Sequence, residues 1–172
     1  RDSSDVNVEP FRGFRHAIGQ ARDVSKVVAP PYDQISPEMQ DQLHMMSAEN
    51  VVRLTLPKQA DYGAAATVLE RWLADGVWSR EERPAIYPYH QTYTVDGGPV
   101  TRAGFVALGE LSDYAEKVVL PHERTHSGPK QDRMRLLEAT GADTGLLFML
   151  VSDPARDLRE ATQISALTGE GI

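Results

Sequence analysis

A chain of 172 residues with 41% hydrophobic residues is long enough to bury one core, and this composition excludes an intrinsically disordered chain. The formal net charge of -7 gives no general attraction to phosphate backbones or anionic lipids, so we expect neither a nucleic-acid nor a membrane partner. The absence of cysteine excludes disulfides and thiol redox chemistry, and with no apolar run of membrane-spanning length and no apolar leader we expect a soluble, cytoplasmic protein.

The first fifty residues predict one helix preceded by a stiff loop. Residues 10–16 are basic and aromatic, and they fit either an edge strand or a loop. Residues 24–33 end in Ala-Pro-Pro-Tyr-Asp, and two consecutive prolines exclude a helix interior and force extended backbone. We therefore expect a rigid loop there. Ser36 and Pro37 suit an N-cap and a first helical position, which predicts a helix to about Met46.

The middle of the chain predicts a strand, a helix and a hairpin. Residues 50–56 alternate between polar and apolar side chains, which favours a strand. Residues 61–74 carry apolar side chains three and four positions apart and are followed by an Asp-Gly stop, which predicts a helix. Residues 85–95 and 100–111 are β-type runs joined through Asp-Gly-Gly, which predicts an antiparallel hairpin.

The last third predicts a short helix over residues 131–139, a buried strand over 146–151 and a further helix over 155–167. Helices and strands therefore follow one another without the strict alternation of a doubly wound sheet. We expect the α+β class, with a mixed or antiparallel sheet, a β-hairpin and packed helices, in a single domain over residues 1–172. Trp72 and Trp78 flank a helix end, and we expect them in the core and its lid instead of in ligand stacking.

The segment from His122 to His126 formally matches the zinc-protease motif H-E-x-x-H. That motif requires two histidines on one helical face with a glutamate between them as the base. Pro121 precedes the segment and Gly128-Pro129 follows it closely, so about two helical turns at most could form. No third ligand follows at the spacing of the metzincins. We therefore predict no residues that hold a resident metal such as zinc, and a zinc hydrolase is the least favoured hypothesis.

The same segment predicts a polar functional loop. Glu123 beside His122 can divide the roles of base and acid, and Arg124, which Thr125 follows, offers a planar fork for a carboxylate or a phosphate. The alternative is a hydrogen-bonded loop anchor without a catalytic role.

A second polar group follows a Gly-Pro pair at the expected start of a helix. Lys130, Asp132 and Arg133 stand where free backbone N–H groups and the positive end of the helix dipole favour an anion, which suggests phosphate. The alternative is a solvated first turn with an intrahelical ion pair.

Asp33 is the third candidate, because a carboxylate on a stiffened backbone suits a site that must hold a metal ion or a hydroxyl group. The alternative is ordinary turn chemistry in which Asp33 caps the turn before Ser36.

The order and spacing of five motifs resemble the family catalogued as domain of unknown function 1015. The motifs are residues 27–33, Val-Val-Ala-Pro-Pro-Tyr-Asp; residues 50–54, Asn-Val-Val-Arg-Leu; residues 85–87, Ala-Ile-Tyr; residues 120–125, Leu-Pro-His-Glu-Arg-Thr; and Lys130-x-Asp132-Arg133. Full-length members of that family are longer, and their second half carries an Asp-Gly-His-His-Arg motif that this sequence lacks. The resemblance therefore implies the N-terminal part of a longer family member.

The Asp-Gly-His-His-Arg motif is similar to one in free-serine kinases with a ParB-like fold. The resemblance thus implies a ParB-like fold and a small-molecule kinase that acts on an amino acid such as serine, with ATP or ADP and Mg²⁺ as cofactors. A non-catalytic module that binds a nucleotide or a protein is the alternative. No Walker loop occurs, which excludes that mode of nucleotide binding.

The kinase hypothesis assigns each candidate residue a role, because phosphoryl transfer needs cations for the phosphate oxygens and a carboxylate for the hydroxyl. The catalytic candidates are Glu123 or Asp33, as base or metal ligand, and His122, as proton partner. The cofactor-binding candidates are Arg124, Thr125, Lys130, Asp132 and Arg133. We expect His122, Glu123, Lys130 and Arg133 to converge on one cleft, with Asp33 within reach.

Overall fold

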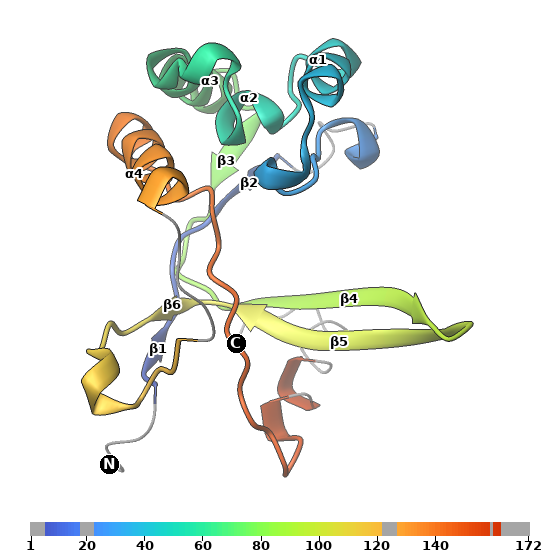
Figure 1. Ribbon diagram of the computed structural model, residues 1–172, viewed down its shortest axis with the longest axis vertical. Coiled ribbons are helices and arrows are strands. Elements are labelled where there is room, and N and C mark those ends of the chain that lie inside the picture. The colour runs from blue at the N-terminus through green and yellow to red at the C-terminus, as the bar shows by residue number, and fades with distance from the viewer. Residues whose placement is uncertain (1–5, 18–22, 122–126, 159, 163–172) are drawn as a thin grey trace. The chain divides into compact units, whose positions relative to one another are not determined.

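The computed structural model describes residues 6–17, 23–121, 127–158 and 160–162, and its chain divides into two compact units (Figure 1). The helical unit comprises residues 14–80 and 124–148, and the hairpin unit comprises residues 1–13, 81–123 and 149–172. Helices and small antiparallel sheets occur together, which confirms the α+β class. The single domain over residues 1–172 and the ParB-like fold stay predictions.

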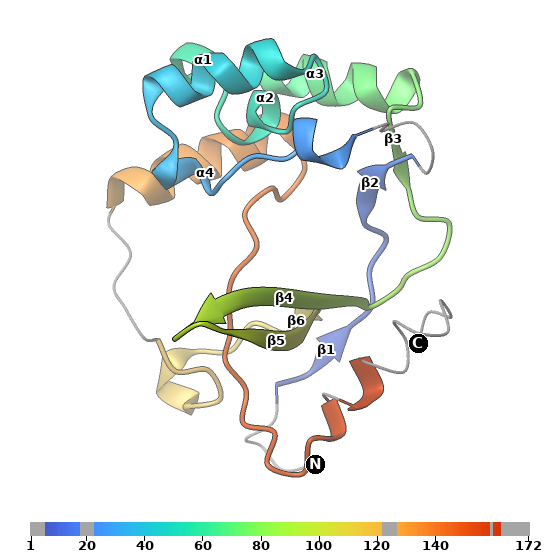
Figure 2. The same cartoon turned by 90° about the vertical axis from the view of Figure 1, so that its right-hand side faces the viewer.

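The helical unit contains most of the helices, whose relative arrangement is visible in Figures 1 and 2. In chain order its elements are β2 (Phe14–His16), η1 (Val24–Lys26), η2 (Tyr32–Gln34), α1 (Pro37–Met46), α2 (Val52–Thr55), η3 (Lys58–Ala60), α3 (Tyr62–Ala74), β3 (Trp78–Arg80) and α4 (Ser127–Thr140). Helix α3 packs against both α2 and α4, and β2 pairs with β3 in antiparallel fashion. Helix α3 is thus the centre of the unit.

Two of the predicted helices begin close to the expected residues, and each has a side-chain cap. The hydroxyl of Ser36 accepts a hydrogen bond from the Met39 backbone N–H at 3.2 Å, and α1 then runs from Pro37 to Met46. The carboxylate of Asp61 accepts from the Ala64 backbone N–H at 2.9 Å at the start of α3. Each cap satisfies a backbone donor that has no partner within its helix. Both predicted helices are confirmed.

The core of the helical unit is built around Trp72, Leu69 and Leu54. Trp72 is only 2% exposed, and its ring centroid lies 5.4 Å from that of the partly buried Trp78. All buried hydrophobic side chains among the described residues belong to this unit: Val27, Leu43, Val52, Leu54, Ala65, Leu69, Trp72 and Leu136. The two tryptophans therefore lie in and over the core, as predicted.

The hairpin unit contains β1 (Val8–Glu9), β4 (Tyr87–Val95), β5 (Gly98–Val106), β6 (Leu108–Gly109) and η4 (Tyr114–Glu116). Strands β4 and β5 pair in antiparallel register from Tyr87 opposite Val106 to Val95 opposite Gly98, so the predicted hairpin is confirmed. Asp96 and Gly97 form its turn with φ values of 50° and 82°, as a two-residue turn of type I′ requires.

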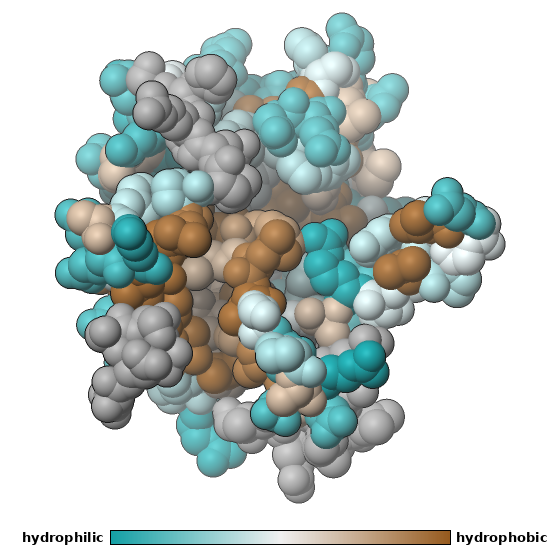
Figure 3. Space-filling model, turned by 60° about the horizontal axis from the view of Figure 1, so that its bottom comes forward, coloured by the Kyte–Doolittle hydropathy of each residue, from teal (hydrophilic) through white to brown (hydrophobic). Residues whose placement is uncertain are grey.

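One face of this hairpin carries several exposed aromatic and aliphatic side chains. Residues paired across the strands share a face, so Tyr93 and Val100 lie together on the side that also carries Tyr89 and Val95. These four side chains are 42 to 52% exposed. The brown areas in Figure 3 mark residues of high hydropathy on the side of the molecule that faces the viewer.

Two predicted strands are wrong. Residues 50–56 form a turn and helix α2, because the Asn50 side chain accepts from the Val52 backbone N–H at 3.0 Å and starts a helical turn. Residues 146–151 form neither strand nor helix (Figure 2), and each side chain is 51 to 89% exposed. A continuous apolar run is buried only when neighbouring strands cover it, and among the described residues none pairs with this segment.

The remaining predictions are refined. Residues 10–16 contain the short strand β2, and helix α4 begins four residues before the predicted start at residue 131. Of the helix expected over residues 155–167, residues 157, 158 and 160–162 are helical, residues 155 and 156 are not, and residues 159 and 163–167 lie outside the described residues. None of the described helices has the length and apolar character needed to cross a membrane.

Candidate functional site

The predicted site residues divide into a described and an undescribed group. His122, Glu123, Arg124 and Thr125 lie outside the described residues, as does His126 of the zinc motif. The predicted convergence on one cleft therefore stays a prediction. The structure does describe Asp33, Lys130, Asp132 and Arg133, and it places all four in the helical unit.

Arg133 links helix α4 to two other segments of that unit. Its Nε donates a hydrogen bond to Asp132 Oδ2 at 2.8 Å, and its Nη2 donates to the same oxygen. Its Nη1 donates to the backbone carbonyl of Thr55, the last residue of α2, at 2.6 Å. The guanidinium carbon also lies 4.1 Å from the centroid of the Tyr32 ring, within the range of a cation–π contact. The arginine therefore joins α4, α2 and η2.

Asp132 is held in turn by helix α3. The hydroxyl of Tyr62 donates to Asp132 Oδ1 at 2.6 Å, so both carboxylate oxygens accept hydrogen bonds from neighbouring side chains. Burial pushes the pKa of Asp132 upward, but the hydrogen bonds from Tyr62 and Arg133 outweigh burial and lower it overall. The same hydrogen bond raises the pKa of Tyr62, because ionised Tyr62 could not donate to the carboxylate. Asp132 is thus ionised and engaged at neutral pH.

The loop before Asp33 is anchored by a buried asparagine. Asn50 is fully buried, and its Nδ2 donates to the backbone carbonyls of Lys26 at 2.8 Å and Val28 at 2.9 Å. The Val51 backbone N–H adds a hydrogen bond to the Val27 carbonyl at 2.8 Å. These hydrogen bonds fix the backbone of residues 26–28, from which the chain continues to Asp33. The sequence signal for this role was the asparagine itself, which is depleted in strands and favoured at helix starts.

Asp33 lies in the 3₁₀ turn η2, directly after the ring that contacts Arg133. The turn is closed by a hydrogen bond from the Gln34 backbone N–H to the Pro31 carbonyl at 2.9 Å. The Asp33 side chain is exposed and makes no hydrogen bond or ion pair with another described residue. Ser36, and not Asp33, caps the following helix. The cap role that sequence reasoning offered as the alternative is therefore absent from the described residues.

Lys130 lies in the first turn of α4, three residues before Arg133. Residues three apart on a helix share a face. The Lys130 side chain is exposed, and it forms no ion pair with another described residue. The four described candidates thus form two pairs: Asp132 and Arg133 are engaged with each other and with the fold, whereas Asp33 and Lys130 present charges that the described part of the chain does not neutralise.

This arrangement suits a ligand that brings its own cation. An exposed lysine can neutralise a phosphate oxygen, and an exposed carboxylate can accept a hydroxyl proton or bind Mg²⁺ together with phosphate and water. No group of three His, Cys, Asp or Glu residues suited to a metal ion occurs within the described ranges. The exposed Asp33 carboxylate can supply one oxygen ligand to a hydrated divalent cation.

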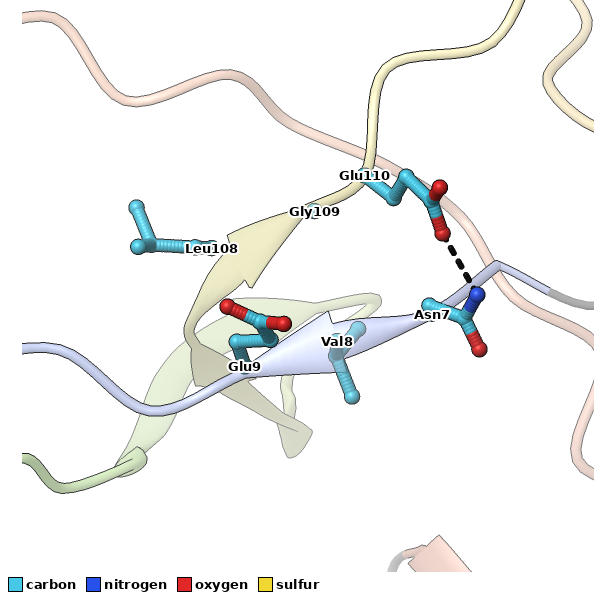
Figure 4. Close-up of a pocket in the computed structure, with 6 residues that line it drawn as sticks. All are labelled: Asn7, Val8, Glu9, Leu108, Gly109 and Glu110. Carbon is cyan, nitrogen blue, oxygen red and sulfur yellow. Dashed lines mark hydrogen bonds between the residues drawn. The ribbon is translucent and has the colours of Figure 1, made fainter.

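The hairpin unit carries a separate surface depression of about 740 Å³. It is lined by Asn7, Val8, Glu9, Leu108, Gly109 and Glu110, and the Asn7 amide donates to the Glu110 carboxylate (Figure 4). None of these residues was a predicted site residue. Its lining has two carboxylates and no cation, so it does not suit a phosphate group.

The sequence model of the family described as "Protein of unknown function (DUF1015)" matches residues 8–168. The match covers nearly the whole chain, and the chain therefore belongs to this family. No curated protein and no solved structure matches the chain.

Proposed function

We propose that this member of a family of unknown function contributes one wall of a phosphoryl-transfer site, at which ATP or ADP with Mg²⁺ phosphorylates the hydroxyl group of a free amino acid such as serine. One observation carries the proposal. An exposed lysine and an exposed carboxylate, Lys130 and Asp33, lack neutralising partners in the described ranges, and they stand on segments that the Arg133–Tyr32 contact joins.

The chemistry assigns a different task to each group. Phosphoryl transfer depends mainly on positioning and on neutralising charge at the phosphate oxygens. Lys130 supplies a cation at a helix N-terminus, where backbone N–H groups also favour an anion. Asp33 orients the acceptor hydroxyl or contributes an oxygen ligand to Mg²⁺. Glu123 is the second candidate for the base and His122 is its proton partner, while Arg124 and Thr125 add phosphate contacts.

A non-catalytic binding module is the second candidate function. The exposed aromatic and aliphatic side chains of β4 and β5 and the exposed run of residues 146–151 favour it, because large exposed apolar areas mark interaction surfaces. A zinc hydrolase is the third and least favoured candidate. Metal analysis of protein purified without chelator decides it. A resident structural or catalytic zinc is bound tightly enough to remain through purification, so less than about one-tenth equivalent of zinc per chain would end that hypothesis.

A turnover assay tests the kinase proposal. Phosphorus NMR would follow the transfer of phosphate from Mg–ATP to serine by the chain and by two variants, Asp33→Asn and Lys130→Gln. Asp33→Asn is expected to lower turnover while it keeps most of the nucleotide affinity, because it removes the charge that orients the hydroxyl. Lys130→Gln is expected to weaken nucleotide affinity by about tenfold to a hundredfold, the value of one charge-assisted hydrogen bond.

Matched controls come from the same chain. Asp75→Asn and Lys117→Gln remove the same charges from other exposed positions, and neither is expected to change turnover or affinity. If Asp75→Asn behaves like Asp33→Asn, and Lys117→Gln behaves like Lys130→Gln, the change in net charge explains the effects, and the assignment of Asp33 and Lys130 is wrong. A binding module would show nucleotide affinity without any turnover.

A further inference from the structure

We infer that Arg133 is a positioning residue, which holds the Tyr32 end of the Pro-Pro-Tyr-Asp loop against helix α4 and so fixes the place of Asp33, instead of binding phosphate itself. This inference rests on the proposed function for the task of Asp33, and it refines the sequence-based assignment of Arg133 to the nucleotide. Lys130 is then the phosphate-contacting cation that α4 supplies.

Three of the five N–H donors of Arg133 are already used within the protein. A guanidinium group has five N–H donors spread over three nitrogens. Two of its nitrogens donate to Asp132 and the third donates to the Thr55 carbonyl, so each nitrogen has a protein acceptor. Asp132 occupies the fork formed by Nε and Nη2, one of the donor pairs that can bind a phosphate in bidentate fashion. A phosphate at this fork would have to displace a carboxylate that accepts from Arg133 and also from a third residue.

That third residue makes displacement costly. Tyr62, on α3, donates to the other oxygen of Asp132, so the carboxylate is fixed from two helices. Thr55 is the last residue of α2, where backbone carbonyls lack partners within the helix. The bond from Arg133 satisfies one such carbonyl. The network thus ties α2, α3 and α4 together before any ligand arrives.

The face of the same guanidinium lies against Tyr32, which precedes Asp33 directly. The other end of the loop is held by Asn50 at Lys26 and Val28, and the chain between the two anchors contains two prolines with restricted φ. A segment fixed at both ends and stiffened between them holds Asp33 in place without a bond to its carboxylate. That carboxylate thereby stays available for a ligand.

A double-mutant cycle separates positioning from direct binding. The variants are Arg133→Met, Tyr32→Leu and the combination of the two, and the readouts are amide hydrogen exchange at Gln34 and Ile35, affinity for Mg–ATP and turnover with serine. Those two amides close turn η2. Arg135→Met is the matched control, because it removes the same charge from an exposed position on the same helix.

Both single variants are expected to speed exchange at the two amides and to lower turnover by about threefold to thirtyfold, the range that a cation–π contact supports. The double variant should be no worse than the more damaging single variant, because the two residues act as one unit. Arg135→Met should change none of the three readouts. Tyr62→Phe offers a milder variant that loosens Asp132 alone, and it should act in the same direction if Arg133→Met does not fold.

The outcomes distinguish this inference from the proposed function. Loss of Mg–ATP affinity in Arg133→Met, with normal affinity and exchange in Tyr32→Leu, makes Arg133 a direct ligand and overturns the inference while the kinase proposal stands. If the unaltered chain binds neither ATP nor ADP, the proposed function fails, and the exchange data alone decide. Unchanged exchange at Gln34 and Ile35 in both variants overturns the positioning role in either case.

Discussion

Replacement of Asn50 by alanine should be among the most damaging single changes in the helical unit outside its apolar core. The substitution removes two hydrogen bonds that Nδ2 donates and one that Oδ1 accepts, at a residue with no exposed surface. The buried N–H of Val52 loses its partner, which costs about 1–3 kcal/mol, and each of the two partly buried carbonyls adds about 0.5–1.5 kcal/mol. The expected loss is therefore about 2–6 kcal/mol of unfolding free energy.

Urea unfolding followed by tryptophan fluorescence measures this loss selectively. Both tryptophans of the chain, Trp72 and Trp78, lie in the helical unit, so their signal reports on the unit that Asn50 stabilises. Asn7→Ala is the matched control, because Asn7 is the other asparagine of the chain, is exposed and belongs to the hairpin unit. It should leave the fluorescence transition unchanged.

Asn50→Asp refines the test without a change of size. Oδ1 can still accept from the Val52 N–H, but the carboxylate has no proton for the carbonyls of Lys26 and Val28. The pKa of this aspartate should rise in the folded state, so the variant should regain stability as the pH falls through that pKa. Asn50→Ala with a loss below about 0.5 kcal/mol, the usual range of a surface change, would refute the reasoning about the anchor.

Two further predictions concern the same unit. Trp72→Ala should cost about 3–5 kcal/mol in urea unfolding followed by circular dichroism, because it empties the centre of the core; a cost below about 1 kcal/mol would contradict the packing. Burial lowers the pKa of His16, with Glu49 opposing, so the unfolded state binds more protons and stability should fall as the pH drops below 6.5. His16→Phe should flatten part of this fall, and an unchanged slope would show that His16 does not titrate on unfolding.

Local signals were enough to predict the elements whose ends are fixed by short-range chemistry. Helices α1 and α3 begin at Ser36 and Asp61, whose side chains accept from N–H groups three residues later. The β4–β5 hairpin turns at Asp96-Gly97, where positive φ at both positions favours this pair of residues. Each of these interactions spans a few residues, so the sequence pattern contains it.

The wrong predictions depended on distant contacts. Residues 50–56 alternate like a strand. In the structure, however, Asn50 donates hydrogen bonds to carbonyls 22 and 24 residues earlier in the chain, and a helical turn follows it. The apolar run 146–151 predicts burial, yet the described residues provide no strand beside it. The period of a pattern cannot show whether a covering partner exists.

The candidate site follows the same division. The sequence pointed to Asp33, Lys130, Asp132 and Arg133 by residue type, and the structure places them in one unit. The sequence could not show which of these side chains form hydrogen bonds within the fold. The partners of Asp132 and Arg133 are Tyr62 and Thr55, which lie 70 and 78 residues away along the chain, and no spacing rule connects them.

The most direct test of the central claim is a calorimetric titration of Mg–ATP and Mg–ADP, with and without serine, into the chain and into Lys130→Gln. We expect saturable nucleotide binding by the chain that weakens by at least about tenfold in Lys130→Gln, since one charge-assisted hydrogen bond to phosphate is lost. Heat of dilution alone for both nucleotides, or equal binding by the two proteins, would contradict the assignment of a phosphate site to helix α4.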